Sequence, residues 1–363
     1  MAVHSTSGER GKKQSPRGIR ALVLWLGAIS FGATLGVGPA QQSSGAQDSS
    51  EQWWKGNTHT HTLNSDGDSP PGEVSHWYRD NGYDFLVLTD HNYYTVVEEL
   101  QREFDREVGH RKKKPFLLIP GEEVTDLFEG EKKAPIHING LDTSRVIGPQ
   151  GGESARVMLQ RNVDAILEAG GVPSLNHPNF YWAVTAEDMV ATKSLRHFEV
   201  YNGHPSVNNF GGGEYQSLEA MWDSMLSTGK VMYGVAVDDA HDFQEWGPRQ
   251  SNPGRGWVMV RAAELSRSAI RKAFEAGDFY SSTGVVLETV NSSAGTLRIE
   301  IQPDDETAFT TTFIGREGRV LAESGKLASS YTLKASDLYV RARVFSSRGE
   351  YAWSQPLFRA ARD

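Results

Sequence analysis

Short apolar runs that alternate with helical stretches are the feature that most constrains how this chain folds. The runs are DFLVLTD (84–90), PFLLIPG (115–121), PIHING (135–140), VPSLNHP (172–178), HFEVYNG (197–203) and VMYGVAVDD (231–239). Residues 154–171 and 212–229 have helical periodicity, and both stretches end at a glycine. Strands alternating with helices predict an α/β fold with a largely parallel sheet, either open or closed into a barrel.

The pattern changes after about residue 284. The segments TLRIEIQP, TTTFIG, YTLKA, LYVRARVFSS and YAWSQPLF are separated by turn residues and have no helical period. They predict a small all-β C-terminal domain over residues 284–363, following an α/β domain over residues 55–283.

The first 40 residues have the layout of a secretory signal. Five of the six charged residues before position 21 are basic, residues 21–36 are uncharged and mostly apolar, and the small residues Gly38 and Ala40 precede a polar run. This predicts a signal peptide over residues 1–40, a linker over 41–54, and export to the bacterial periplasm or the cell exterior. An uncleaved membrane anchor is the alternative, although the apolar stretch is short for a full span.

Composition narrows the chemistry. The chain has 37 Lys and Arg against 46 Asp and Glu, a formal net charge of −9 that becomes −13 without residues 1–40. Such an acid excess disfavours duplex nucleic acid and anionic membranes as partners. No cysteine occurs in the 363 residues, which excludes disulfides, thiolate zinc sites and cysteine nucleophiles. A metal site must therefore use histidine and carboxylate ligands, which suit Zn, Mn or Fe.

Six of the eleven histidines lie at or beyond the carboxyl ends of the predicted strands, beside acids. In α/β barrels these ends form one face, where the side chains converge. The candidate metal ligands are His59, His61, Asp66, His91, Glu123, His137, His177, Asp239 and His241. Since a catalytic zinc takes only about three protein ligands, this set predicts two or three divalent ions that share a carboxylate. We interpret the other five histidines as ordinary core or surface residues: His4, His76, His110, His197 and His204.

Local spacing supports this set. In the H-x-H segment 59–61, alternate residues of an extended chain point to the same side, so both imidazoles can reach one ion. Asp239 and His241 have the same spacing. Asp66 lies in an SDGD turn, from which a short acid can reach back to the strand ends.

The ordered motifs HTHT, SDGD, TDHN, GEEVT, HING, NHP, EVYNG and DDAH resemble the polymerase and histidinol phosphatase (PHP) superfamily of metallohydrolases. The resemblance covers roughly residues 55–245 and implies a distorted seven-stranded (β/α) barrel with up to three metal ions. It implies one metal held by His59, His61, Glu123 and Asp239, a second by Glu123, His137 and His177, and a third by Asp66, His91 and His241.

The bridging acid is identified by the family pattern Gly-x-Glu, which from Gly121 selects Glu123 over Glu122. Glu123, Asp239 and His241 are the residues expected to take part in catalysis. The resemblance implies a metal-dependent hydrolase of a small phosphoester that acts through metal-bound hydroxide.

Two alternatives to a phosphoesterase remain open. The first is hydrolysis of a carboxylic or carbamate ester, because HPNFYW, WGPRQSNPGRGWVMV, FYSSTGV and AWSQP resemble a branch that includes carbaryl-hydrolysing enzymes. The second is a non-catalytic metal-binding exported protein, which the complete ligand set disfavours. Serine hydrolase and nucleotide-binding motifs are absent from the sequence.

Further candidates lie near these motifs. Arg249 and Arg255 follow the last ligands in a Gly/Pro-rich loop and are either an anion clamp or solvated loop charges. Tyr181 and Trp182 either line an apolar pocket or pack in the fold. Four other residues at strand ends are expected to orient ligands or face the cavity: Asn176, Asn202, Glu199 and Tyr201.

Overall fold

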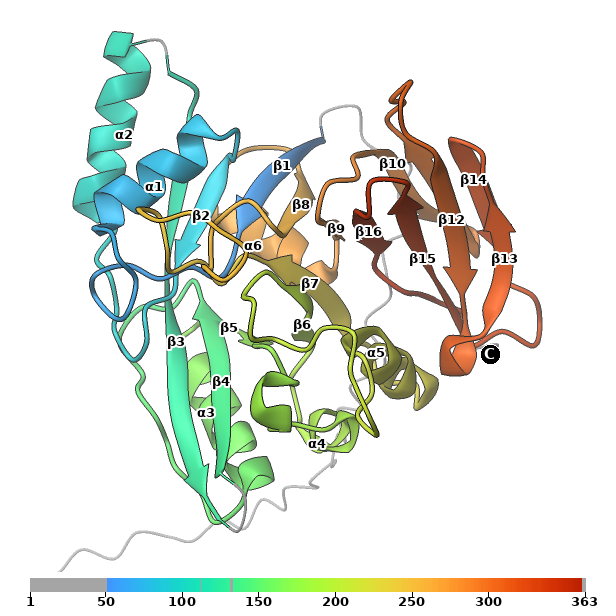
Figure 1. The fold of residues 1–363 in the computed structure, drawn as a ribbon, viewed down its shortest axis with the longest axis horizontal. Coiled ribbons are helices and arrows are strands. Elements are labelled where there is room, and N and C mark those ends of the chain that lie inside the picture. The colour runs from blue at the N-terminus through green and yellow to red at the C-terminus, as the bar shows by residue number, and fades with distance from the viewer. Residues whose placement is uncertain (1–50, 112, 131–132, 361–363) are drawn as a thin grey trace, which may run out of the picture. The chain divides into compact units, whose positions relative to one another are not determined.

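The computed structural model describes residues 51–111, 113–130 and 133–360 (Figure 1). The predicted signal peptide and most of the predicted linker lie outside the described residues. Strand β1 begins at Gln52, so residues 52–54, which the linker prediction included, belong to a strand. None of the helices in the described ranges is long and apolar enough to cross a membrane.

The described strands are β1 (Gln52–Asn57), β2 (Phe85–Leu88), β3 (Leu117–Glu129), β4 (Lys133–Leu141), β5 (Val172–Leu175), β6 (His197–Asn202), β7 (Tyr233–Val237), β8 (Trp257–Ala262), β9 (Phe279–Ser282), β10 (Leu287–Ser293), β11 (Thr296–Ile301), β12 (Phe309–Ile314), β13 (Val320–Ser324), β14 (Ala328–Thr332), β15 (Tyr339–Ser346), β16 (Tyr351–Ser354) and β17 (Leu357–Phe358). The helices are α1 (Pro71–Asp80), α2 (Glu98–Arg111), α3 (Ala155–Glu168), α4 (Ala186–Ala191), α5 (Leu218–Ser227) and α6 (Arg267–Ala276), with short 3₁₀ turns η1 (Phe180–Trp182) and η2 (Arg316–Gly318).

Strands β1 to β7 are hydrogen-bonded in the order of the sequence, each to the next (Figure 1). The pairs β1–β2, β2–β3, β5–β6 and β6–β7 are parallel. A parallel bridge between Thr60 and Ala240 joins the segments that follow β1 and β7. The two ends of the row therefore meet on the side where the strands end, and the fold is of the predicted mixed α/β class.

Strand β4 runs opposite to its neighbours, which corrects the sequence prediction. It pairs antiparallel with both β3 and β5. Strand β3 also continues to Glu129 instead of ending near residue 121. His137 consequently lies in the middle of β4, opposite Thr125, rather than at the end of a parallel strand.

The helices begin where the sequence offers caps. Ser154 and Ser217 each accept a hydrogen bond from a backbone N–H in the first turn of α3 and α5. Helix α3 agrees with its predicted range to within a few residues. Helix α5 begins only at Leu218, because Gly211 and Gly213 before it adopt the left-handed backbone of a turn.

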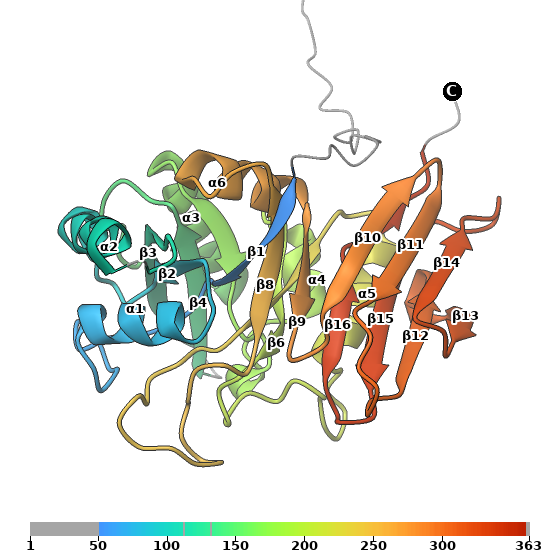
Figure 2. The same ribbon diagram turned by 90° about the horizontal axis from the view of Figure 1, so that it is seen from above.

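The predicted C-terminal strands are present, and they divide between the main sheet and a second sheet. From β1 the pairing passes through β8, β9 and β16 to β15, β12 and β13. Strands β10, β11 and β14 form a second, three-stranded sheet (Figure 2). Leu297 and Ile299 of this sheet share an apolar cluster with Val340 and Val344 of β15, so side chains between the two sheets form one core.

A buried ion pair connects β15 to α5. Arg341, only 1% exposed, donates from Nε and Nη2 to the Asp223 carboxylate at 2.8 and 2.6 Å. The hydroxyl of Tyr339 donates to the same carboxylate at 2.8 Å. These hydrogen bonds offset the cost of removing both charges from water. They fix the C-terminal strands against the helix that leads into β7.

Candidate metal centre

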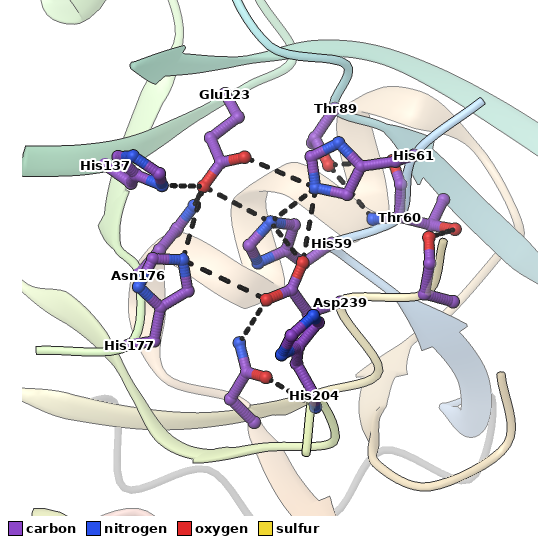
Figure 3. A network of polar contacts seen from close by, with 12 residues as sticks. His59, Thr60, His61, Thr89, Glu123, His137, Asn176, His177, His204 and Asp239 are labelled. Atoms are coloured by element: carbon purple, nitrogen blue, oxygen red, sulfur yellow. Dashed lines mark hydrogen bonds and ion pairs between the residues drawn. The ribbon is translucent and has the colours of Figure 1, made fainter. Parts of the chain in front are cut away.

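The first two histidines follow β1 in an extended segment. The backbone N–H of His59 donates to Asn57 Oδ1 at 2.9 Å, and the N–H of His61 donates to the carbonyl of Ala240 at 2.9 Å. These bonds hold the segment so that the two imidazoles meet, with their Nε2 atoms 3.1 Å apart (Figure 3). Both side chains are fully buried.

A tight turn after this segment carries Asp66. The Asp90 carboxylate accepts hydrogen bonds from the N–H of Thr62 at 2.7 Å and from the hydroxyl of Ser65 at 2.9 Å. Gly67 completes the turn, because a Cβ there would lie 2.7 Å from the backbone of the H-x-H segment. The turn therefore holds Asp66 close to the histidines.

Asp66 faces three histidines at the most open part of the cluster. Its carboxylate oxygens lie 3.3 Å from His241 Nε2, 3.5 Å from His91 Nε2 and 3.5 Å from His61 Nδ1. The side chain of Asp66 is 56% exposed, whereas that of His61 is fully buried. Solvent and small molecules therefore reach the cluster from the side of Asp66.

The two adjacent acids of β3 point to opposite faces of the strand. Glu123 faces the histidines, with Oε1 3.0 Å from His137 Nδ1 and Oε2 2.9 Å from His91 Nδ1. Glu122 accepts hydrogen bonds from the backbone N–H groups of residues 147 and 148 at 2.6 and 2.7 Å. Of the two, only Glu123 is placed in the cluster.

His177 and Asp239 follow β5 and β7 with φ angles of 21° and 51°. Positive φ is uncommon in residues other than glycine and is found at functional sites. Asp239 Oδ1 lies 3.2 Å from Nε2 of both His59 and His61. His177 Nε2 lies 3.4 Å from Glu123 Oε1.

All nine candidate ligands thus converge, although they come from segments far apart in the sequence. They form four overlapping groups whose ligand atoms lie within 4.8 Å of one another: His61–Asp66–His91–His241, His59–Glu123–His177, His59–His61–Asp239 and His91–Glu123–His137. Glu123 belongs to two groups, as a bridging carboxylate would. The grouping differs from the implied one, because His59 lies with His177 and His61 also joins the group around Asp66.

Further polar side chains hold the cluster from outside. Glu199 accepts from His59 Nδ1 at 2.6 Å and from the backbone N–H of His177 at 2.7 Å. Asn202 Nδ2 donates to Glu199 at 2.8 Å and to Asp239 at 3.0 Å. Because Nδ1 of His59 is occupied by Glu199, its Nε2 is left to face the cluster.

Two amide side chains, Asn176 and Asn139, support Glu123. Asn176 Nδ2 donates to Glu123 Oε1 at 2.7 Å and to Asn139 Oδ1 at 3.0 Å. The sequence indicated Asn176, but it gave no reason to select Asn139. The available signal was the alternation along β4, since Asn139 lies two residues after His137 and opposite Glu123.

Charges in the cluster stabilise one another. Burial disfavours the ionised carboxylates, but the surrounding histidines hold the pKa of Glu123 and of Asp239 well below the usual range. Burial also opposes protonation of His59, yet the neighbouring carboxylates raise its pKa well above the usual value. Burial and the charge of His241 lower the pKa of His61 to about 3. Glu123 and Asp239 are therefore anionic at neutral pH and available to a cation.

The residues present fit divalent metal ions. His137 Nδ1 and Glu123 Oε2 are buried and lie 3.0 and 2.9 Å from Glu123 Oε1 and His91 Nδ1, but in the described part of the chain neither atom makes a contact with the geometry of a hydrogen bond. Buried polar atoms left unpaired destabilise a fold, and coordination of a cation would satisfy both. The donors are imidazole nitrogens and carboxylate oxygens, the set that suits Zn, Mn or Fe.

The loop after β7 uses Arg255 for its own structure. The guanidinium donates to the carbonyls of Gly203 and Gly247 at 3.0 Å each. Arg249 is exposed on the same loop. Of the two readings left open for Arg255, the structure therefore favours a role in the loop over an anion clamp.

Of the aromatic residues after β5, Phe180 contacts the cluster. Its ring centroid lies 5.1 Å from that of His177 and 6.1 Å from that of His137. Trp182 stacks on a neighbouring tyrosine at 4.3 Å, and Tyr181 is 66% exposed. The apolar contact with the cluster is thus made by Phe180, the residue before the two candidates, for which a pocket role and a packing role had been left open.

Tyr201 does not share the orientation of Glu199, although the two alternate in sequence. The pairing of β6 with β7 shifts register between these residues, which turns Tyr201 away. Tyr201 lines a separate cavity of about 210 Å³ together with Phe210, Tyr351 and Trp353.

His204 is placed beside the cluster, which corrects its interpretation as an ordinary residue. Its ring centroid lies 5.4 Å from that of His241, and Figure 3 shows the ring next to Asp239. No local pattern signalled this position, because His204 follows β6 in a loop whose course depends on tertiary contacts.

No protein-family model matches the sequence, and the comparison with curated proteins gave no match. The chain is similar to a two-domain protein from Bacteroides vulgatus described as containing a PHP-like metal-dependent phosphoesterase, with 19% identity, 82% of this chain and 95% of that chain covered, and a TM-score of 0.45. It is also similar to a protein from Bifidobacterium adolescentis described as a metal-dependent phosphoesterase, with 15% identity, 54% of this chain and 89% of that chain covered, and a TM-score of 0.37. A third similar structure is an amidohydrolase from Chromobacterium violaceum with bound sulfate. Its sequence identity is 17%, the match covers 55% of this chain and 93% of that chain, and the TM-score is 0.33.

Proposed function

We propose that this protein is a metal-dependent hydrolase that cleaves a small phosphoester. The observation that carries the proposal is the convergence of six histidines and three acids into four overlapping groups within 4.8 Å. Such a centre suits two or three divalent ions, Zn, Mn or Fe, and the residues that would hold them are the nine candidate ligands. The two adjoining ends of the row β1–β7 support its assignment as a seven-stranded barrel of PHP type.

Divalent ions bound there would polarise an ester oxygen and lower the pKa of a coordinated water. The protein's own side chains position the ligands. Glu199 and Asn202 orient His59 and Asp239, while Asn176 orients Glu123. Glu123, Asp239 and His241 are proposed as the residues in contact with the reacting groups.

A carboxylic or carbamate ester is the second candidate substrate. Two observations favour it: Phe180 gives the cluster an apolar neighbour, and Arg255 is engaged with backbone carbonyls instead of being available to a phosphate. A neutral ester needs no cationic clamp, so its binding depends less on the loop after β7.

The test is an activity panel with metal-analysed protein. The expected result is metal-dependent hydrolysis of phosphomonoesters to inorganic phosphate, or of phosphodiesters to a phosphomonoester and an alcohol, with weak turnover of aryl esters and carbamates. If aryl esters or carbamates are cleaved in a metal-dependent way and phosphoesters are not, the second candidate is correct. An inactive protein that still binds metal would favour a non-catalytic role.

We also propose that the chain is exported and that its partners are small esters, not duplex nucleic acid. The support is the sequence of residues 1–40 and the net charge of −13 on the remainder. Cell fractionation tests the first part, because a full-length chain found in the cytoplasm would contradict export. Residues 284–363 are proposed as a β-rich unit that supplies no metal ligand.

A further inference from the structure

His204 is held in one orientation by its own loop. Its backbone N–H donates to Asn202 Oδ1 at 2.8 Å. Its Nδ1 accepts from the backbone N–H of Ser206 at 3.2 Å, and the Ser206 hydroxyl lies 2.7 Å from the same atom. Since Asn202 also contacts Asp239 at 3.0 Å, the loop is tied directly to the cluster.

These contacts determine which ring nitrogen of His204 carries hydrogen. A backbone N–H can only donate, so Nδ1 has to be an acceptor without a proton. In the neutral ring, the hydrogen is then on Nε2. Figure 3 shows the ring beside Asp239, with its outer edge toward the cluster.

His204 is not needed as a metal ligand. The four groups of ligand atoms are complete without it. An Nε2 that carries hydrogen has no lone pair to coordinate a metal. Its ring is half-buried and lies 5.4 Å from that of His241, next to the group that contains the exposed Asp66. It is therefore a hydrogen-bond donor located between the cluster and solvent.

We propose that His204 is a substrate-positioning residue whose Nε2–H donates a hydrogen bond to an oxygen of the ester bound at the centre. The inference rests on the proposed function and deepens it. An anionic ester needs donors near the metals, and Arg255, one of the two candidate clamps, is engaged elsewhere. The Nε2–H of His204 supplies such a donor.

Three variants test the role. His204→Phe keeps a ring but has no donor, whereas the amide of His204→Gln restores a donor near the Nε2 position. Ser206→Ala removes the hydroxyl contact to Nδ1 of His204. Elemental analysis of each variant and calorimetric titration with inorganic phosphate are the measurements. We expect unchanged metal content in all variants. The affinity for phosphate should fall about tenfold or more in His204→Phe, because a hydrogen bond to a charged group is lost. In His204→Gln the phosphate affinity should partly recover. Ser206→Ala is expected to fall between wild type and His204→Phe.

A structural role would give a different result, because it would not be rescued by glutamine and would change metal content or folding. Nuclear magnetic resonance of ¹⁵N-labelled histidine adds a direct readout, since the Nε2–H tautomer of His204 and a shift of its signal on phosphate addition are expected. Any of three results would overturn the inference and leave the proposed function standing. These are an Nδ1–H tautomer of His204, loss of metal in His204→Phe, and a phosphate affinity of His204→Phe equal to that of wild type. A wild-type protein that neither binds phosphate nor cleaves phosphoesters would overturn both.

Discussion

At the scale of single residues, neighbouring side chains of one type have very different settings. Glu122 and Glu123 are both buried, yet one accepts backbone hydrogen bonds and the other lies among histidines. His197 and His204 both accompany β6, yet only the second approaches the cluster. Substitutions at such pairs separate a role in the centre from a role in the fold.

The two acids of β3 give the first prediction. Glu123→Gln removes a charge from the centre, so activity and bound metal should both fall by more than the roughly 10- to 100-fold that loss of an outer-shell partner costs. Glu122→Gln should keep metal and most activity but lower the free energy of unfolding by about 1–3 kcal/mol, because its carboxylate accepts two backbone N–H bonds. Comparable losses of metal in the two variants would show that the wrong acid has been assigned.

His197 gives a prediction about pH. It is fully buried, its Nε2–H donates to the carbonyl of Phe274 at 2.9 Å, and burial lowers its pKa to about 4 from 6.5. Between these two pH values the unfolded chain binds a proton that the folded protein does not. Stability from this group is therefore present above pH 6.5 and is lost as the pH falls to 4, about 3 kcal/mol in total.

Urea unfolding of wild type and His197→Gln across pH 4 to 7 is the measurement. The variant should lack this decrease in the free energy of unfolding. The difference in free energy of unfolding between wild type and His197→Gln should therefore narrow as the pH falls. Other titrating groups are common to both proteins and cancel in the comparison. A difference that stays constant over the range would contradict a depressed pKa of His197.

At the scale of elements, ion pairs tie α5 to β15. Arg341 of the strand pairs with Asp223 and, at 3.0 Å, with Glu219 of the helix. Asp223 on the helix accepts from both Arg341 and Tyr339 on the strand. The loop that precedes the helix begins at Asn202 and carries His204, so the position of α5 bears on the cluster. This contact is a long-range link between the C-terminal strands and the elements around the candidate centre.

Arg341→Met should lower the free energy of unfolding by about 3–5 kcal/mol, because it leaves the Asp223 carboxylate buried without its cationic partner. The double variant Asp223→Leu with Arg341→Met removes both charges and should be less destabilised than the single variant. Denaturant unfolding of the two variants and wild type checks this expectation. A single variant within 1 kcal/mol of wild type would mean that the pair contributes little.

At the scale of the whole molecule, the centre gathers side chains from the ends of β1, β2, β5 and β7 and from the middle of β3 and β4. Its histidines and carboxylates lie within ion-pair distance of one another. Bound ions would join all these elements at once, so metal binding and global stability should be coupled.

Elemental analysis of protein purified without chelator should find about two or three transition-metal ions per chain, given that one catalytic ion needs only about three protein ligands. Removal of metal by chelator should lower the melting temperature and abolish activity, and addition of Zn or Mn should restore both. Less than one ion per chain, with no thermal shift on adding either metal, would refute a multinuclear centre.

The sequence by itself determined the chemistry of the candidate site and much of its local geometry. The choice of Glu123 over Glu122 came from the resemblance to the Gly-x-Glu family pattern. The nine candidate ligands and the H-x-H alternation were read from the residues themselves, as were most strands and the helices α3 and α5. These features depend on contacts within a few residues, such as the two-residue repeat of a strand or a cap on a first turn.

Only the tertiary structure decided which strand runs against the others and which additional side chains join the cluster. His137 and Asn139 reach it because β4 pairs antiparallel with β3, and His204 does so because its loop is tied to Asn202. Strand orientation and loop course are determined by pairing between segments far apart in the chain, whose free energy no local pattern encodes. The same reason explains why Arg255 is directed to two backbone carbonyls, one of its own loop (Gly247) and one of the loop after β6 (Gly203).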